Sequence, residues 1–125
     1  MANIKFAVLV TLLALALAAA NIRGDATLTC EQVTEWLTPC IPYGVYGGTV
    51  APECCSGIYK LNAAYKSNDD IRAACTCIQD GAAAIPLLDY DRINEIPGLC
   101  GTSCPYKVYP STNCSRCVFT VSMHV

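Results

Sequence analysis

The spacing of ten cysteines in 125 residues constrains this chain more than any other feature. Eight of them are separated by nine, thirteen, zero, nineteen, one, twenty-two and thirteen residues: Cys30, Cys40, Cys54, Cys55, Cys75, Cys77, Cys100 and Cys114. A short chain so rich in cysteine is typical of a disulfide scaffold in an oxidising compartment. Eight cysteines allow about 105 pairings, so the spacing alone does not fix which are joined.

The first 26 residues predict a removable secretory signal peptide. Lys5 is followed by an uncharged apolar run, residues 6–20, and small residues precede a cleavage that we expect after Ala26. A membrane anchor is the alternative, but the run is shorter than the roughly 20 residues that span a bilayer. We therefore expect a secreted, extracellular domain over residues 27–125, of which residues 118–125 form a disordered tail.

The charge of that domain excludes some partners. Residues 27–125 hold six basic and nine acidic side chains. A net negative charge disfavours nucleic-acid binding and gives no general attraction to anionic membranes.

Apolar periodicity predicts four short helices, and hence an all-α fold, a disulfide-stapled four-helix bundle. The expected helices are residues 30–41, 53–65, about 69–85 and 89–96, with a loop over 42–52 and stops at Pro86 and Pro97. Thr29 and Gln32 form the pattern of a capping box, and Asn68 or Asp69 is expected to cap the third helix. The tail after Ile96 has too many Pro, Gly and Ser residues for a helix, so it is ordered only if it is held down.

The inward positions of these helices are apolar. They are Val33, Leu37, Ile58, Leu61, Ile71, Ile78, Ala82, Ala83, Ile85, Ile93 and Ile96. Periodicity alone favours an ordinary filled core here. Disulfides relax the need to fill it, because each is worth on the order of 3–4 kcal/mol in the chain-entropy model, and the many alanines leave room.

The pattern C-x9-C-x13-CC-x19-CxC-x22-C-x13-C resembles that of the plant non-specific lipid-transfer proteins, type 1, over the chain up to Cys114. The segments 39–43, 54–58, 96–98 and 105–108 agree with it. The resemblance implies an internal hydrophobic tunnel and four disulfides: Cys30–Cys77, Cys40–Cys54, Cys55–Cys100 and Cys75–Cys114. The polar residue Thr76 between the two CxC cysteines supports this pairing, because an inward threonine needs a hydrogen-bond partner.

The same resemblance implies which residues bind lipid. Tyr106 matches the family's head-group tyrosine, with Lys107 directed to solvent, and Arg72 stands one position beyond the usual arginine. The expected tunnel wall comprises Val33, Leu37, Ile58, Leu61, Ile78, Ala82, Ile85, Ile96 and Val108. The implied partners are fatty acids and phospholipids, with transient membrane contact and a monomeric chain, and no cofactor or metal.

Two cysteines lie outside the eight-cysteine pattern. Cys104 and Cys117 are even in number and attached near Cys100 and Cys114. We expect them to form a fifth disulfide, because free thiols are a liability in a secreted protein. In the alternative, Cys117 is free and Cys104 is a small buried apolar residue.

Two other functions are the alternatives to lipid binding. A protein-binding module, such as an amylase or protease inhibitor, or a defence protein, is built on a related eight-cysteine scaffold. An enzyme is disfavoured, because the single histidine, His124, lies in the tail and no catalytic set or phosphate loop accompanies it.

Overall fold

A computed structural model describes residues 28–118. The expected signal peptide over residues 1–26 and residues 119–125 of the expected disordered tail lie outside this range. The all-α prediction is confirmed, since residues 28–118 form helices and contain no strand. The helices are α2 (Cys30–Leu37), α3 (Ile41–Tyr46), α4 (Pro52–Ala64), α5 (Asn68–Ala83) and α6 (Tyr90–Leu99), with 3-10 turns η1 (Thr38–Cys40) and η2 (Cys114–Arg116).

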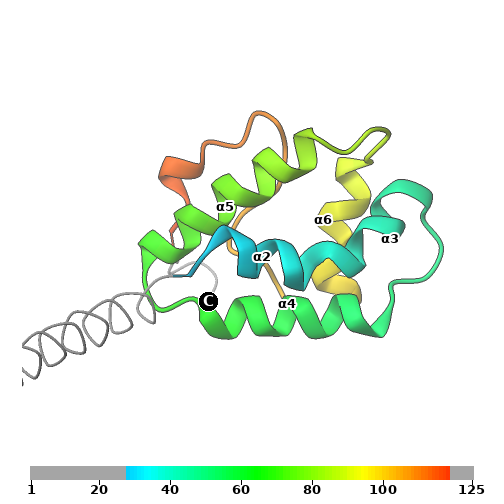
Figure 1. The fold of residues 1–125 in the computed structure, drawn as a ribbon, viewed down its shortest axis with the longest axis horizontal. Coiled ribbons are helices and arrows are strands. Elements are labelled where there is room, and N and C mark those ends of the chain that lie inside the picture. The colour runs from blue at the N-terminus through cyan, green and yellow to red at the C-terminus, as the bar shows by residue number, and fades with distance from the viewer. Residues whose placement is uncertain (1–27, 119–125) are drawn as a thin grey trace, which may run out of the picture.

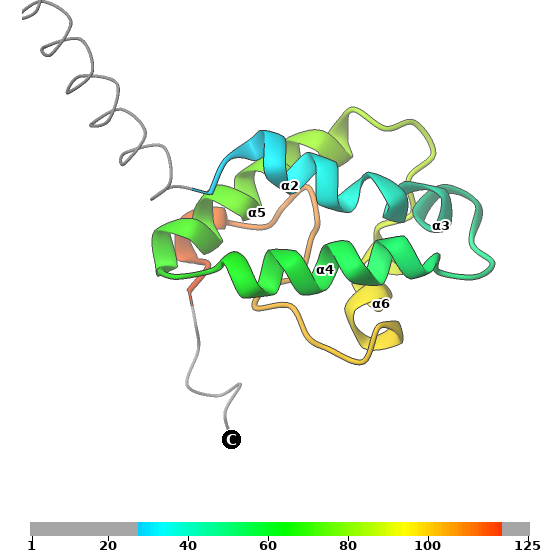
Figure 2. The same cartoon turned by 60° about the horizontal axis from the view of Figure 1, so that its bottom comes forward.

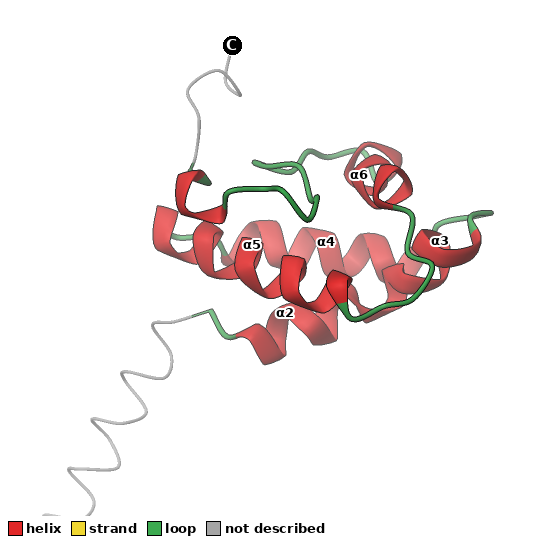
Figure 3. Ribbon diagram, turned by 90° about the horizontal axis from the view of Figure 1, so that it is seen from above, coloured by secondary structure: helices red, strands yellow, loops and turns green. Residues whose placement is uncertain are grey.

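The three helices α2, α4 and α5 form the framework. The segment that follows α6, residues 100–118, is called the tail from here on, and it covers one side of the framework. α2 packs against both α4 and α5 (Figure 1). Seen from above, α2 lies on one side of α4 and α5, and the tail lies on the other (Figure 3). The tail leaves α6, passes α4 and returns to η2 beside α5 (Figure 2). None of the helices within residues 28–118 combines the length and apolar character needed to cross a membrane.

The first predicted helix is interrupted. It begins as expected at the Thr29–Gln32 capping box, but it tightens into η1 at Thr38 and resumes as α3, with a proline in the first turn of each new segment. The expected loop from residue 42 is therefore wrong as far as residue 46. Proline is tolerated at these positions because the first helical N–H groups have no partner within the helix.

Two other predicted boundaries are wrong. Ser67, rather than Asn68 or Asp69, caps α5, because its side chain accepts a hydrogen bond from the N–H of Asp70. α6 continues through Pro97 to Leu99. Pro97 sits in the last turn, where its missing N–H removes one hydrogen bond and the Cys100 N–H still bonds to the Ile96 carbonyl.

A glycine allows α2 and α4 to approach closely. A Cβ built on Gly57 would lie 1.8 Å from the carbonyl oxygen of Trp36. Only glycine leaves space for this backbone contact. Trp36 itself packs partly buried against the cluster that contains Val33 and Leu61.

Candidate functional site

An apolar cavity lies between the helices and the tail. Its volume is about 150 Å³. The lining residues come from α2, η1, α3, α4, α5, α6 and the connecting and tail segments: Val33, Thr34, Leu37, Thr38, Cys40, Ile41, Ile58, Leu61, Asn62, Tyr65, Cys77, Ile78, Gly81, Ala82, Ile85, Leu88, Ile93, Ile96, Pro97, Ser103, Cys104 and Val108. Small-molecule sites are usually apolar hollows of this kind with a few polar groups.

The nine apolar residues predicted to form the tunnel wall all line this cavity. The prediction that Ala83 points inward is wrong, because Ala83 is exposed on α5 next to the buried Ala82. Of the alanines expected to leave room, Ala82 is the one that lines the cavity.

Three amide side chains fasten the tail, and each comes from a different helix. Asn94 on α6 makes the tightest attachment: its Nδ2 donates to the Val108 carbonyl at 2.9 Å, and its Oδ1 accepts from the Val108 N–H at 2.7 Å. This pair holds Val108 at the cavity wall. Asn94 was not predicted from the sequence, because an amide in a helix carries no signal of its tertiary partner.

The other two amides bind the tail after and before Val108. Gln79 Nε2 on α5 donates to three successive parts of the tail, the carbonyls of Tyr109, Pro110 and Thr112, at 2.8–3.0 Å. On α4, Asn62 Nδ2 lies 3.2 Å from Thr102 Oγ1 and 3.3 Å from the Ser103 carbonyl. Because backbone polar groups need partners when they are buried, these amides stand in for regular secondary structure.

Two tyrosines meet beside the cavity. The hydroxyl groups of Tyr65 and Tyr106 are 3.1 Å apart. Burial raises the pKa of both phenols, so both stay protonated. Tyr65 lines the cavity, whereas Tyr106 is 9% exposed and borders a second hollow between α6 and the tail. Tyr65 was recognisable as an inward residue four positions after Leu61, but nothing marked its hydroxyl.

The structure places Arg72 away from the cavity, and its expected contact with lipid stays a prediction. Arg72 does not line the cavity. Its guanidinium bonds to Asp69 at 2.9 Å and to the Ser115 carbonyl at 3.1 Å, on the outer face of α5. The inward position is Ile71, which is fully buried against Tyr106 and Cys75. Adjacent helical residues face different directions, so the one-position offset removes the arginine from the site. Lys107 is exposed, as predicted.

The four disulfides implied by the resemblance are present: Cys30–Cys77, Cys40–Cys54, Cys55–Cys100 and Cys75–Cys114. Thr76 is exposed between the two buried CxC cysteines, which confirms the predicted orientation.

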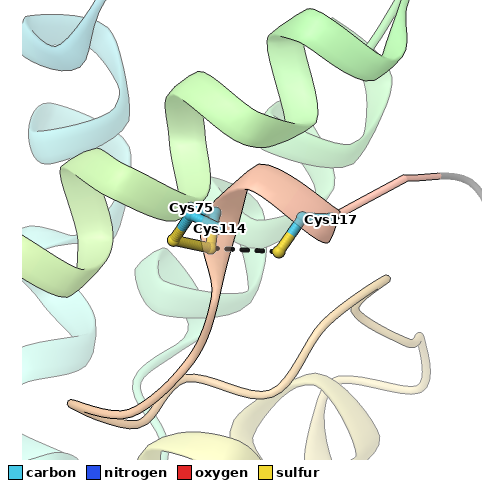
Figure 4. A group of neighbouring side chains, drawn as sticks. All are labelled: Cys75, Cys114 and Cys117. Atoms are coloured by element: carbon cyan, nitrogen blue, oxygen red, sulfur yellow. Dashed lines mark hydrogen bonds between the residues drawn. A yellow bond between two sulfur atoms is a disulfide. The ribbon is translucent and has the colours of Figure 1, made fainter.

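The fifth disulfide is not formed. Cys104 and Cys117 are free thiols, and burial raises the pKa of each. Cys117 Sγ lies 3.2 Å from Cys75 Sγ, against the Cys75–Cys114 bond (Figure 4). Cys104 lines the cavity. The sulfurs of Cys75, Cys114 and Cys117 lie within 4.8 Å of one another. Two of them share a disulfide, so they do not provide the thiolates that a metal centre of this kind needs.

A stapled set of helices around an apolar, uncharged cavity defines a class of small carrier proteins for apolar ligands. Residues 30–114 match the model of the protease inhibitor/seed storage/LTP family. The chain belongs to this family.

Relatives with related sequences are named as lipid-transfer proteins. A non-specific lipid-transfer protein of sunflower, Helianthus annuus, is 45% identical over 89 residues, which cover 71% of this chain and 77% of the relative. The structure of the hazelnut allergen Cor a 8 has 41% identity and a TM-score of 0.68, with 72% and 98% of the two chains covered. Barley non-specific lipid transfer protein 1, in complex with a lysophosphatidylcholine, has 32% identity and a TM-score of 0.69, with 72% and 99% covered.

Proposed function

We propose that this protein binds acyl lipids in the apolar cavity and transfers them between membranes or surfaces outside the cell. The observation that carries the proposal is the cavity wall, which is built from aliphatic side chains of every principal helix and from the tail. The relatives support it, since they include structures solved with lysophosphatidylcholine, with two phospholipid molecules and with palmitate.

The affinity comes from the acyl chain. Each methylene group that leaves water contributes roughly 0.8 kcal/mol, from which the cost of ordering the ligand is subtracted. An aliphatic wall contacts any chain in the same way, so discrimination among long acyl chains is weak. Fatty acids and phospholipids are therefore the proposed ligand class.

The proposed mode of action is that of a monomeric carrier with no catalytic step. It loads and releases its ligand in transient contact with a membrane. We also propose that residues 1–26 are removed and that the protein is exported to the extracellular space.

Displacement of a fluorescent fatty acid from the purified domain tests this function. Palmitate and a lysophospholipid are expected to displace the probe with micromolar midpoints. Ile78→Trp fills the cavity from α5 and is expected to abolish probe binding, whereas Tyr46→Ala changes an exposed side chain and serves as the matched control. Absence of saturable binding, together with inhibition of an amylase or a trypsin-like protease, would replace the proposal with a protein-binding function.

A further inference from the structure

The cavity wall carries no formal charge. Within residues 28–118, none of the side chains that line it belongs to Asp, Glu, Lys, Arg or His. An ionised head group that enters such a space loses its hydration and gains no counter-ion, whereas a neutral polar group needs only a hydrogen bond. An uncharged wall therefore disfavours lipids whose head group is ionised relative to lipids whose head group is neutral.

Every cation in the described part of the chain is placed elsewhere. The six are Lys60, Lys66, Arg72, Arg92, Lys107 and Arg116, and none lines the cavity. Arg72 is engaged by Asp69 and the Ser115 carbonyl. Arg92 donates to the Val45 carbonyl at 3.1 Å and lies 3.7 Å from Asp89. Lys107 borders the second hollow, between α6 and the tail.

The polar groups that remain on the wall suit a neutral donor. The orientation of the Asn62 amide follows from its bond to the Ser103 carbonyl. A carbonyl can only accept a hydrogen bond, so the amide atom that faces it is the donor Nδ2. This leaves the amide oxygen Oδ1 as an acceptor for a ligand. The Tyr65 hydroxyl is already shared with Tyr106. A ligand hydroxyl can donate to an amide oxygen, whereas a carboxylate is repelled by it.

The electrostatics beside Tyr65 point the same way. Burial raises the pKa of the Tyr65 phenol, partly offset by the hydrogen bond with Tyr106, while Cys104, Cys117 and the Asp70 carboxylate make smaller contributions that raise it. The Lys66 N–H bonds to Asp70 at 2.9 Å, and this keeps the carboxylate at the start of α5 next to Tyr65. An anionic head group near Tyr65 would have the Asp70 carboxylate nearby, and none of the cations in residues 28–118 lines the cavity.

We propose that this cavity prefers acyl lipids with an uncharged, hydrogen-bond-donating head group, such as long-chain primary alcohols, over ionised fatty acids. The preference rests on the proposed lipid-binding function and narrows its ligand class. Its structural basis is the absence of a cation from the cavity wall, since Ile71 holds the inward position of α5 and Arg72 faces outward.

Competition of dodecanol and dodecanoate against one neutral fluorescent acyl probe tests the preference. At about pH 8 the carboxylate is ionised, and dodecanol is expected to bind at least about tenfold more tightly. Equal affinity, or tighter binding of dodecanoate, would overturn the preference and leave the proposed function standing. Failure of both ligands to displace the probe, or of the probe to bind, would overturn the proposed function and this preference with it.

A charge-introducing variant makes the test independent of ligand solubility. Ser103 is exposed and lines the cavity, so a lysine there folds without burying its ammonium group. Ser103→Lys is expected to shift the affinity ratio towards dodecanoate by at least about threefold, as an exposed ion pair allows, while Ser103→Gln leaves the ratio unchanged. A ratio that is equal in both variants would contradict the electrostatic basis of the preference.

Discussion

The helical framework and the tail enclose the same cavity but are held by different forces. Disulfides join α2 to α5, η1 to α4, and α4 to the end of α6. The tail is fixed covalently only at its two ends, by Cys100 and Cys114, and between them it depends on amide hydrogen bonds. A hydrogen bond is worth about 1 kcal/mol net, far less than a crosslink.

This difference assigns different tasks to the two regions. Covalent links between helices keep the walls apart without a filled core. A wall fastened by hydrogen bonds opens at lower free energy than the rest of the fold, which is the usual property of ligand-gating segments. The tail is therefore the part that we expect to move when a ligand enters.

Reduction of the disulfides is expected to have the largest effect. Each of the four links contributes on the order of 3–4 kcal/mol in the chain-entropy model, so the reduced chain should lose its helices and its ligand together. Circular dichroism and probe binding after reduction and alkylation measure both. Retention of helicity and binding would show that the framework does not need its crosslinks.

Gly57→Ala is the next most severe change. The new methyl group would overlap the Trp36 carbonyl and force α2 and α4 apart, at a cost on the order of 3 kcal/mol. Urea denaturation measures the loss. Gly98→Ala, where a Cβ meets nothing within 4 Å, is the control and should be neutral or slightly stabilising. An equal response of the two variants would refute the close packing.

Asn94→Ala tests the tail. It removes both hydrogen bonds to Val108 and should lower stability by about 1–3 kcal/mol, with increased hydrogen exchange in residues 104–112 and little change in α2. Asn94→Asp keeps the acceptor for the Val108 N–H but places a carboxylate oxygen against the Tyr90 and Val108 carbonyls, so it should lower stability at least as much as Asn94→Ala. Faster exchange spread evenly over the framework would contradict the separation of the two regions.

Tyr106→Phe and Arg72→Ala should have the smallest effects. The first removes one hydroxyl bond to Tyr65 and should cost about 1 kcal/mol. The second breaks an exposed ion pair, worth about 0–1 kcal/mol, and should leave lipid affinity unchanged because Arg72 faces away from the cavity. A marked loss of affinity in Arg72→Ala would restore it as a head-group residue.

The features of the framework that follow a regular spacing along the chain were predictable from the sequence. Cysteine spacing predicted the four disulfides through the family resemblance. Helical periodicity placed eight of the nine aliphatic wall residues on inward faces, whereas Val108 lies in the tail and was predicted from the resemblance. Helix ends at prolines were less predictable, since Pro42 and Pro97 lie in positions where their lost hydrogen bond costs little. The tail was least predictable, because Gln79 and Asn94 bind backbone groups that are distant in sequence.

The two additional cysteines show the same limit. Parity and attachment near Cys100 and Cys114 favoured a Cys104–Cys117 bond. The turn at η2 instead directs Cys117 to the Cys75–Cys114 disulfide. Side-chain direction in an irregular segment depends on tertiary packing, and spacing along the chain does not encode it.

Nuclear Overhauser contacts between a bound acyl chain and the protein test the central claim most directly. In a saturated complex with dodecanol, the chain is expected to contact the methyl groups of Ile78 from the framework and of Val108 from the tail at the same time. Contacts confined to exposed residues such as Leu87 or Leu99 would contradict a binding site between the helices and the tail.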